Sequence, residues 1–176
     1  MVKPNAGLSG DRGGAPGGRD AARTALAWQI LSEVVDPEIP TVSIVDLGMI
    51  HAVWVAEEGV VVALMPTFLG CPALPIIRDQ VISALTPLGS VRVEVVRHPA
   101  WTTERITAAG REKLAAAGFA LPGAVADLTF TEWPPVPCPH CASRTTRLDS
   151  LFGPTPCRAI HYCGTCRQPF EQFKPV

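Results

Sequence analysis

The sequence has little that would suit binding to nucleic acid or insertion into a membrane. Its 176 residues carry a formal net charge of −1, with no run of Lys or Arg to bind a phosphate backbone. No apolar stretch approaches the roughly 20 residues that a transmembrane helix needs. The first 20 residues are rich in Gly and Pro and lack the apolar core of a signal peptide. We therefore expect a cytoplasmic protein that binds neither nucleic acid nor membrane.

Recognisable catalytic motifs are also missing. The sequence shows no Ser-His-Asp ordering, no phosphate-binding loop and no dinucleotide-binding glycine pattern. It therefore does not predict an enzyme with independent turnover. Its hydrophobic content of 47% is nevertheless sufficient for a real core in one or two domains.

Four of the six cysteines form two Cys-x-x-Cys pairs, Cys138 with Cys141 and Cys163 with Cys166. Two such pairs can make a tetrahedral thiolate site, for which Zn²⁺ is the usual metal. A segment this short cannot bury enough apolar surface to fold alone, so the metal would supply its folding free energy. We predict a structural zinc ribbon over residues 136–176. Iron in the same tetrahedron, reduced structural thiols and two disulfides are the alternatives.

Other candidate ligands lie near these pairs. Cys157 lies between them and is not expected as a fifth ligand, because four thiolates already complete a zinc tetrahedron. It is a spare thiol, a packing residue or a ligand for a transient iron centre. His140 and His161 are expected to face solvent or to support the ligands from outside the tetrahedron.

Periodicity predicts an α+β fold in which helices pack on a small sheet over residues 21–120. The expected elements are a helix over 21–35, a hairpin over 49–55 and 60–65, a helix from about 72 to 85, a strand over 91–95, and a helical segment over 103–117. Thr102 or Thr103 is expected to cap the last segment, and Gly110 to interrupt it. Residues 1–20 are typical of a disordered tail. The proline-rich residues 121–135 are expected to link this domain to a separately folding ribbon.

Cys71 is the candidate reactive residue. Pro72 and Pro75 follow it and suit the first turn of a helix, which places Cys71 at or near the helix N-cap. Free amides and the positive end of the helix dipole would stabilise its thiolate, the form that binds iron or attacks an electrophile. The alternative is a small buried hydrophobe, because free cysteines are often buried.

Asp36, Glu38 and Asp46 form an acidic group around a proline-rich turn. They could bind a metal, act as a general base or pair with a basic residue of a partner. Their alternative roles are structural: Asp36 would end the preceding helix, and Asp46 would fix a turn before Gly48.

Several stretches together resemble the SufT-like family of iron–sulfur cluster assembly factors. They are residues 36–40 (DPEIP), 44–50 (IVDLGMI), Thr67 and 70–72 (GCP). The resemblance implies that Cys71 is the reactive or metal-contacting residue and that Asp36, Glu38, Asp46 and Thr67 line the same region. Cys71 and Cys157 are then the candidates for holding transient iron or an iron–sulfur cluster, although the family pattern does not settle the role of Cys157.

Further stretches are similar to the PaaD-like family, the D components of phenylacetyl-CoA ring-epoxidising systems. They are residues 101–107, 110–111, 138–141, 152–157, 163–166, 169–170 and 173–174, so that both resemblances together cover about 22–175. This similarity implies an accessory role in assembling or maturing the metal centre, iron–sulfur or di-iron, of an oxygenase in aerobic phenylacetate degradation. The implied partners are oxygenase or reductase subunits and the iron–sulfur assembly machinery, with a homodimer as a further expectation.

Two other functions remain open. One is a structural subunit of the oxygenase complex, which should co-purify with it in stoichiometric amounts. The other is a thiol-dependent enzyme that uses Cys71 with Asp36 or Glu38 as the base, which should turn over without partner proteins. A nucleic-acid-binding ribbon is disfavoured by the charge.

Overall fold

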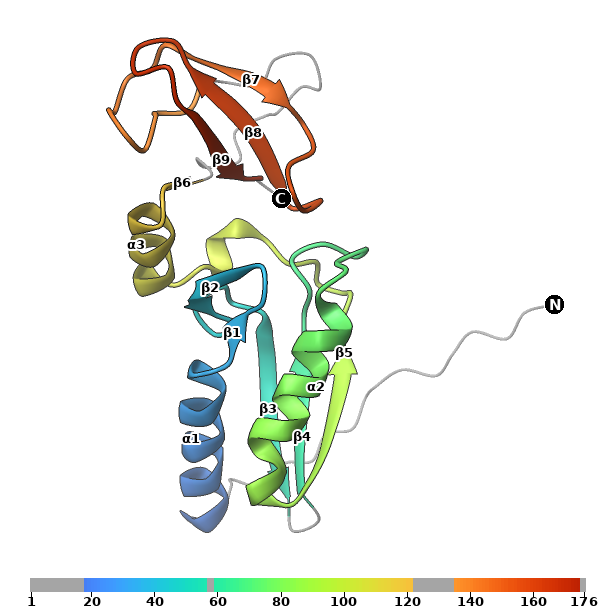
Figure 1. Ribbon diagram of the computed structural model, residues 1–176. Coiled ribbons are helices and arrows are strands. Elements are labelled where there is room, and N and C mark those ends of the chain that lie inside the picture. Colours follow the sequence, from blue (N-terminus) through green and yellow to red (C-terminus); the bar gives the residue numbers. More distant parts are fainter. Residues whose placement is uncertain (1–17, 57–58, 122–134, 175–176) are drawn as a thin grey trace, which may run out of the picture.

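The computed structural model describes residues 18–56, 59–121 and 135–174, and it confirms an α+β fold with a C-terminal ribbon (Figure 1). The α/β part contains α1 (Gly18–Ser32), β1 (Val35–Asp36), β2 (Ile39–Ser43), β3 (Ile50–Ala56), β4 (Gly59–Leu64), α2 (Leu74–Leu85), η1 (Thr86–Leu88), β5 (Ser90–Val95), η2 (Thr103–Arg105) and α3 (Ala108–Ala116). The short β6 (Phe119–Ala120) leads to the ribbon strands β7 (Thr146–Ser150), β8 (Arg158–Cys163) and β9 (Pro169–Phe173). No helix in these ranges is long and apolar enough to cross a membrane.

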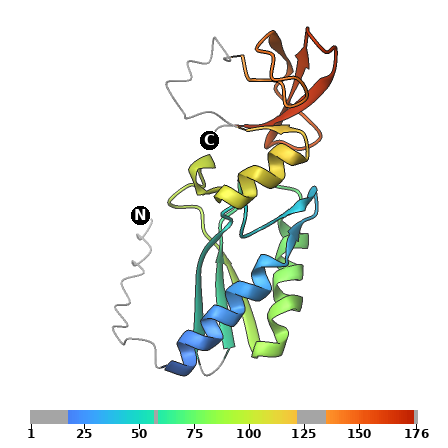
Figure 2. The same ribbon diagram turned by 90° about the vertical axis from the view of Figure 1, so that its left-hand side faces the viewer.

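The main sheet has the strand order β3-β4-β5. Strands β3 and β4 form the predicted antiparallel hairpin, whereas β4 and β5 are parallel and are connected through α2. Helices α1 and α2 pack on the same face of this sheet (Figures 1 and 2). Because β4 and β5 are parallel, both end toward the ribbon, and the loop that follows β4 lies at that end (Figure 1).

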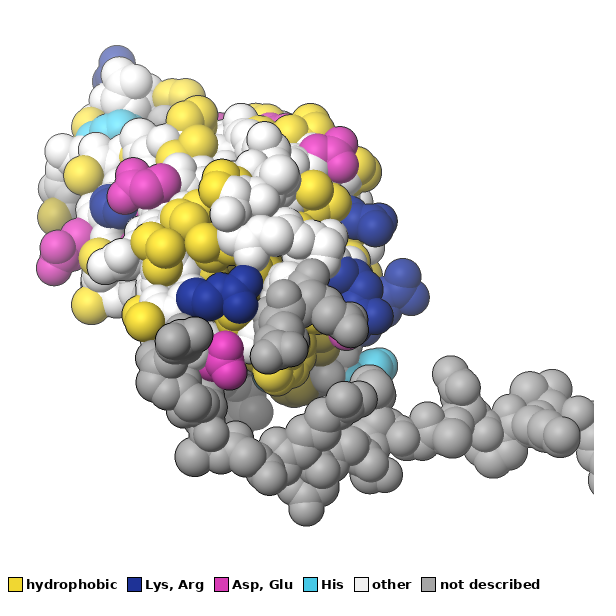
Figure 3. Space-filling view, turned by 90° about the horizontal axis from the view of Figure 1, so that it is seen from below, with side chains coloured by type: hydrophobic (Ala, Val, Ile, Leu, Met, Phe, Trp, Pro, Cys, Tyr) yellow, Lys and Arg dark blue, Asp and Glu magenta, His cyan; other side chains and the backbone are white. Residues whose placement is uncertain are grey.

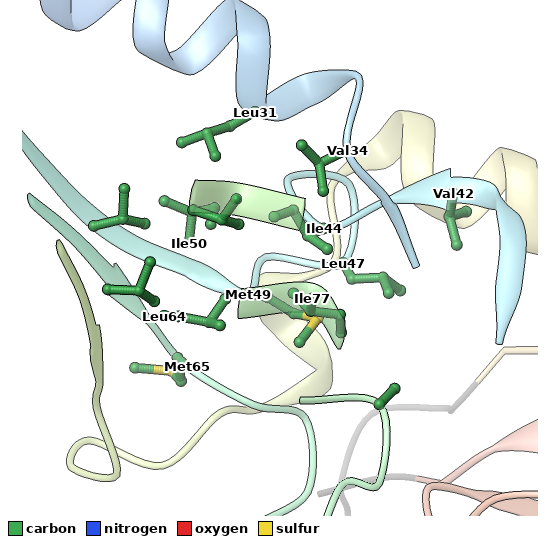
Figure 4. Close-up of a cluster of buried hydrophobic side chains, with 14 of the residues drawn as sticks. Leu31, Val34, Val42, Ile44, Leu47, Met49, Ile50, Leu64, Met65 and Ile77 are labelled. Carbon is green, nitrogen blue, oxygen red and sulfur yellow. The ribbon is translucent and has the colours of Figure 1, made fainter. Parts of the chain in front are cut away.

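The core lies between the helices and the sheet (Figure 4). Helix α1 contributes Ala27 and Leu31, and α2 contributes Ile77 and Val81, all fully buried. Leu26 of α1 is 44% exposed, so the buried stripe of this helix follows Ala27 and Leu31.

Residues 35–43, interpreted from sequence as a proline-rich turn, form two short antiparallel strands, β1 and β2, around that turn. The last helical segment divides into η2 and α3, but the break falls before Ala108 and not at Gly110, and the side chain that caps α3 is that of Thr107. The Thr107 hydroxyl accepts a hydrogen bond from the Gly110 amide at 2.9 Å. Gly110 does not interrupt α3. A Cβ there would lie 2.5 Å from the carbonyl oxygen of Asp46, so a side chain would prevent this contact.

The ribbon contacts the α/β part through two features. Strand β6 lies just before the expected proline-rich connection, and it pairs in parallel with β9, giving the order β6-β9-β8-β7. Phe173 of β9 is 1% exposed and belongs to the main core, with its ring centre 5.7 Å from that of Trp101. The predicted connection over 121–135 and the predicted tail over 1–20 lie largely outside the described residues. Separate folding of the two parts stays a prediction.

The end of the molecule that lies farthest from the ribbon has a surface of mixed charge (Figure 3). Its basic side chains are interspersed with acidic and hydrophobic ones. This distribution agrees with the formal net charge of −1.

Candidate functional site

The four cysteines of the ribbon form a closed group. Their Sγ atoms all lie within 4.8 Å of one another, with 3.7 Å between Cys138 and Cys166 and 3.6 Å between Cys141 and Cys163. Sulfur atoms about 2.3 Å from a tetrahedral Zn²⁺ are separated by about 3.8 Å. The observed spacing therefore fits zinc, as the sequence predicted.

Each Cys-x-x-Cys pair is closed by the same backbone turn. The Ala142 amide donates to the Cys138 carbonyl at 2.8 Å, and the Arg167 amide donates to the Cys163 carbonyl at 2.9 Å. Ala142 and Arg167 each follow the second cysteine of a pair and have left-handed backbone, with φ of 58° and 60°. The repeated geometry presents two thiols from each turn to one point.

The thiols differ in how readily they ionise. Backbone amides of Cys166 and Thr165 lower the pKa of Cys163 to about 6. Burial and the neighbouring thiols raise the pKa of Cys166 to about 12. Binding of a metal ion would displace the protons that the four thiols still carry.

Neither predicted histidine belongs to this thiol group. His161 is 1% exposed, its Nε2 lies 2.9 Å from Gln172 Oε1, and its ring stacks on Phe170. His140 is exposed on the surface. His161 is therefore a packing residue of the ribbon, and the side chain of His140 faces solvent.

A second group of candidate residues meets where the ribbon contacts the α/β part. Asp36 and Glu38 from the β1–β2 turn, Thr67 and Cys71 from the loop after β4, and Cys157 from the loop before β8 line one pocket. Its volume of about 20 Å³ admits a single water-sized occupant. The structure thus brings together five candidate residues from three segments that lie far apart in the sequence.

Cys71 is half-buried and precedes Ala73, the N-cap of α2. Burial raises the pKa of the Cys71 thiol, although the amides of Ala73 and Leu74 act in the opposite direction. Nearby Cys157 and Asp36 raise it further. The lowered pKa expected from the helix N-terminus is therefore wrong for the metal-free protein, because burial outweighs the helix amides.

Asp36 forms part of the same pocket and is 8% exposed. Its Oδ1 accepts hydrogen bonds from the amides of Glu38 at 2.9 Å and Ile39 at 3.0 Å, which fix the turn. Burial raises the pKa of Asp36 despite these bonds. Among the described residues, no hydrogen bond ends at its Oδ2.

Arg158 is a residue that sequence reasoning missed. It is 5% exposed, and its Nε donates to Thr155 Oγ1 at 2.7 Å while its NH1 donates to Glu171 Oε2 at 2.8 Å. Its NH2 also lies 3.5 Å from Glu38 Oε2, so one guanidinium joins the ribbon to the acidic turn. The Thr155 hydroxyl lies 3.2 Å from Cys157 Sγ. The only sequence signal was an arginine beside Cys157, and its partners come from distant segments.

Asp46 does not line the pocket, although its neighbour Leu47 does. Its Oδ2 accepts from the Ser43 amide at 3.1 Å and pairs with the Lys113 ammonium of α3. Burial would raise the pKa of Asp46, but the hydrogen bonds from Lys113 and Ser43 outweigh it and lower the pKa. The Thr107 amide also donates to the Asp46 carbonyl at 2.9 Å. These contacts anchor α3 to the turn after β2.

Comparison with known proteins matches the two parts of the chain to different families. A family described as iron–sulfur cluster assembly protein matches residues 24–96, and the PaaD zinc beta ribbon domain matches residues 123–174. The Fe-S protein maturation auxiliary factor YitW of Bacillus subtilis (strain 168) is 40% identical over 81 residues, or 44% of this chain and 78% of YitW. The crystal structure of a domain of unknown function, DUF59, from Bacillus anthracis superposes with a TM-score of 0.52 and 29% identity, covering 55% of this chain and 94% of that one.

A longer match joins both parts. The Escherichia coli (strain K12) protein named as the D component of a 1,2-phenylacetyl-CoA epoxidase is 42% identical over 152 residues. The match covers 85% of this chain and 91% of that protein. The chain therefore belongs to the PaaD family and combines an iron–sulfur cluster assembly domain with a zinc ribbon.

Proposed function

We propose that this protein is an accessory factor that assembles or matures the metal centre, iron–sulfur or di-iron, of a phenylacetyl-CoA ring-epoxidising oxygenase. The observation that carries the proposal is the pocket in which Cys71 lies with Asp36 and Glu38. Thiolates and carboxylates together suit iron, which is here the cargo and not a resident cofactor. Membership of the PaaD family supports the choice of client.

The size of the pocket favours a metal cargo over an organic substrate. A volume of about 20 Å³ holds an ion or a water molecule, whereas pockets for small organic ligands are usually at least about 300 Å³. A thiol-dependent enzyme acting on a coenzyme A ester would need far more space. The raised pKa of Cys71 also means that iron binding would displace a proton, so the affinity of the site for iron would weaken as the pH falls.

The surface beside the pocket supports a protein client. Phe68, which lines the pocket, and its neighbour Leu69 are exposed, and Phe152 of the ribbon is 71% exposed. The Lys174 ammonium lies 4.7 Å from the ring centre of Phe152, and the Lys174 amide donates to the Cys157 carbonyl at 2.9 Å. Large exposed apolar side chains commonly mark protein interaction sites. A client docked here would reach the pocket directly.

The test is to produce the oxygenase and its reductase with the wild-type protein, with Cys71→Ser or with neither. We expect lower iron or cluster content, and lower activity, in the last two preparations, with client polypeptide levels unchanged. Metal analysis and the visible absorption of the purified clients provide the measurement.

Full metal content and activity in all three preparations would exclude a maturation role. Stoichiometric co-purification with the oxygenase would then identify a structural subunit.

A further inference from the structure

We infer that the zinc ribbon supplies the second thiolate of the iron-handling site, Cys157, so that the site is complete only where the two domains meet. The inference rests on the proposed function and names its cargo chemically. The cargo is ferrous iron bound by the thiolates of Cys71 and Cys157 and by the carboxylate of Asp36, either alone or with inorganic sulfide that would lie outside the pocket of about 20 Å³.

Contacts of the side chain and of the backbone fix the position of Cys157. Its Sγ lies 3.2 Å from the Thr155 hydroxyl, which also accepts from Arg158 Nε at 2.7 Å. Its carbonyl accepts from the Lys174 amide, and the Gly153 amide donates to the Arg158 carbonyl at 2.9 Å. A spare thiol on a loose loop would not need this support. The backbone instead holds Cys157 against the pocket that Cys71 lines.

The three proposed ligands come from three separate segments. Cys71 belongs to the loop after β4, Asp36 ends β1, and Cys157 precedes β8. The Oδ1 of Asp36 is occupied by two backbone amides, while no described hydrogen bond engages its Oδ2. One carboxylate oxygen is thus available for a metal that the thiols approach from the other two segments.

The contrast with the zinc site indicates what this second site does. Among the described residues, the ribbon cysteines are the one group of three or more potential ligands with all donor atoms within 4.8 Å. The pocket donors line one cavity, but the atoms of Cys71, Cys157 and Asp36 are not all within 4.8 Å of one another. Binding of one iron ion by all three would therefore have to draw their segments closer together, and the site would close only around its cargo. Binding displaces the thiol protons to solvent and transfers no electron.

Because Cys157 belongs to the ribbon, the assembly domain alone would lack this ligand. The match to the iron–sulfur assembly family ends at residue 96, and Cys157 lies beyond it. The pocket wall that Cys157 forms is therefore built by sequence outside that match. Arg158 strengthens the junction, because its guanidinium lies 3.5 Å from Glu38 across the domain boundary.

The test uses full-length protein with zinc already in the ribbon, titrated without oxygen with Co²⁺ as an optical probe. Parallel titrations use Fe²⁺ alone and Fe²⁺ with sulfide, which distinguishes the two forms of cargo. The wild type should bind one ion beyond zinc and show thiolate-to-cobalt absorption. Cys157→Ser and Cys157→Ala should weaken binding by at least about tenfold, as should Cys71→Ser. Asp149→Asn, an exposed carboxylate on β7, is the matched ribbon control and should bind normally.

Zinc content and circular dichroism confirm that each variant is folded, and the alanine variant guards against an effect of the serine hydroxyl. Wild-type affinity and absorption in both Cys157 variants would overturn the inference. A client that loses its metal with Cys71→Ser but is fully loaded with Cys157→Ser would overturn it too, while leaving the proposed function intact. Full loading with both variants would instead remove the proposed function.

Discussion

Two buried aspartates, Asp36 and Asp46, have opposite pKa shifts, and the difference follows from their partners. Asp46 pairs with Lys113 and has a lowered pKa, whereas burial outweighs the amide hydrogen bonds of Asp36 and raises its pKa. Only Asp36 lines the pocket. A carboxylate whose charged form is destabilised by burial is typical of functional sites, because such residues are often retained at a cost in stability.

The pairing of Asp46 predicts a pH-dependent loss of stability in Asp46→Asn. We expect unfolding free energy to fall by about 1–3 kcal/mol at neutral pH, because the substitution leaves Lys113 without its carboxylate. The folded pKa of Asp46 is lowered, so its contribution is present above the unfolded pKa near 3.8 and is lost as the pH falls through the folded value. Urea unfolding at pH 7 and at about pH 3 checks this. An equal difference at both pH values would contradict the ionic role.

Asp36→Asn is the natural comparison. An Asn oxygen can still accept from the amides of Glu38 and Ile39, and the substitution removes a buried charge. We therefore expect stability to be unchanged or higher at pH 7, with the deficit confined to cargo binding.

At the scale of elements, the ribbon is expected to depend on a bound metal ion for its stability. Few of its residues form a core of their own, namely Ala120, Val136, Cys138, Cys163, Phe170 and Cys166. Two of its three strands are only five residues long. So small an apolar cluster cannot offset the loss of chain entropy without additional free energy from a bound ion.

Cys141→Ser should therefore unfold β7, β8 and β9, while the α/β part stays folded but with a lower free energy of unfolding, because Phe173 of β9 leaves its core. Elemental analysis should show about one zinc per wild-type chain and much less in the variant. Circular dichroism and limited proteolysis would locate the unfolded segment. A native wild-type protein that contains neither zinc nor iron would refute the metal assignment.

Local sequence signals predicted the elements that depend on local pattern. The β3–β4 hairpin and α2 follow from alternation, helical spacing and Pro75 in the first turn. Gly110 was misinterpreted because the need for glycine arises from its contact with Asp46, which is remote in sequence. Strand β6 was missed because two residues carry no periodicity, and its partner β9 lies far along the chain.

For the candidate site, too, local features could be predicted from the sequence and long-range contacts could not. The grouping of the four ribbon cysteines could be predicted from spacing alone, because the Cys-x-x-Cys turn is local. The grouping of Cys71 with Cys157 could be only a suggestion, since it depends on how the ribbon meets the α/β part. The pKa of Cys71 was predicted in the wrong direction, because burial cannot be read from a loop sequence.

At the scale of the whole molecule, Phe173 couples the two domains. It belongs to β9 but is buried in the main core against Trp101. Phe173→Ala should lower the stability of the α/β part by about 3–5 kcal/mol, although the substitution lies in the ribbon. Chemical unfolding followed by Trp fluorescence measures this, with zinc content as the check that the ribbon is intact. Phe152→Ala, at an exposed aromatic position, is the control and should have little effect.

An unchanged transition in Phe173→Ala would mean that the domains fold independently, as the sequence alone suggested. A lowered transition with zinc retained would mean that the ribbon completes the first core.

The contact of β9 with the main core also sets an order for acquiring metals. The folded ribbon places both Phe173 and Cys157 against the α/β part. If the ribbon folds only with zinc, as predicted, a chain that has not yet received zinc would present only two of the three proposed iron ligands, Cys71 and Asp36. Zinc binding would then precede iron binding. In cells short of zinc, the protein would not bind iron at an incomplete site.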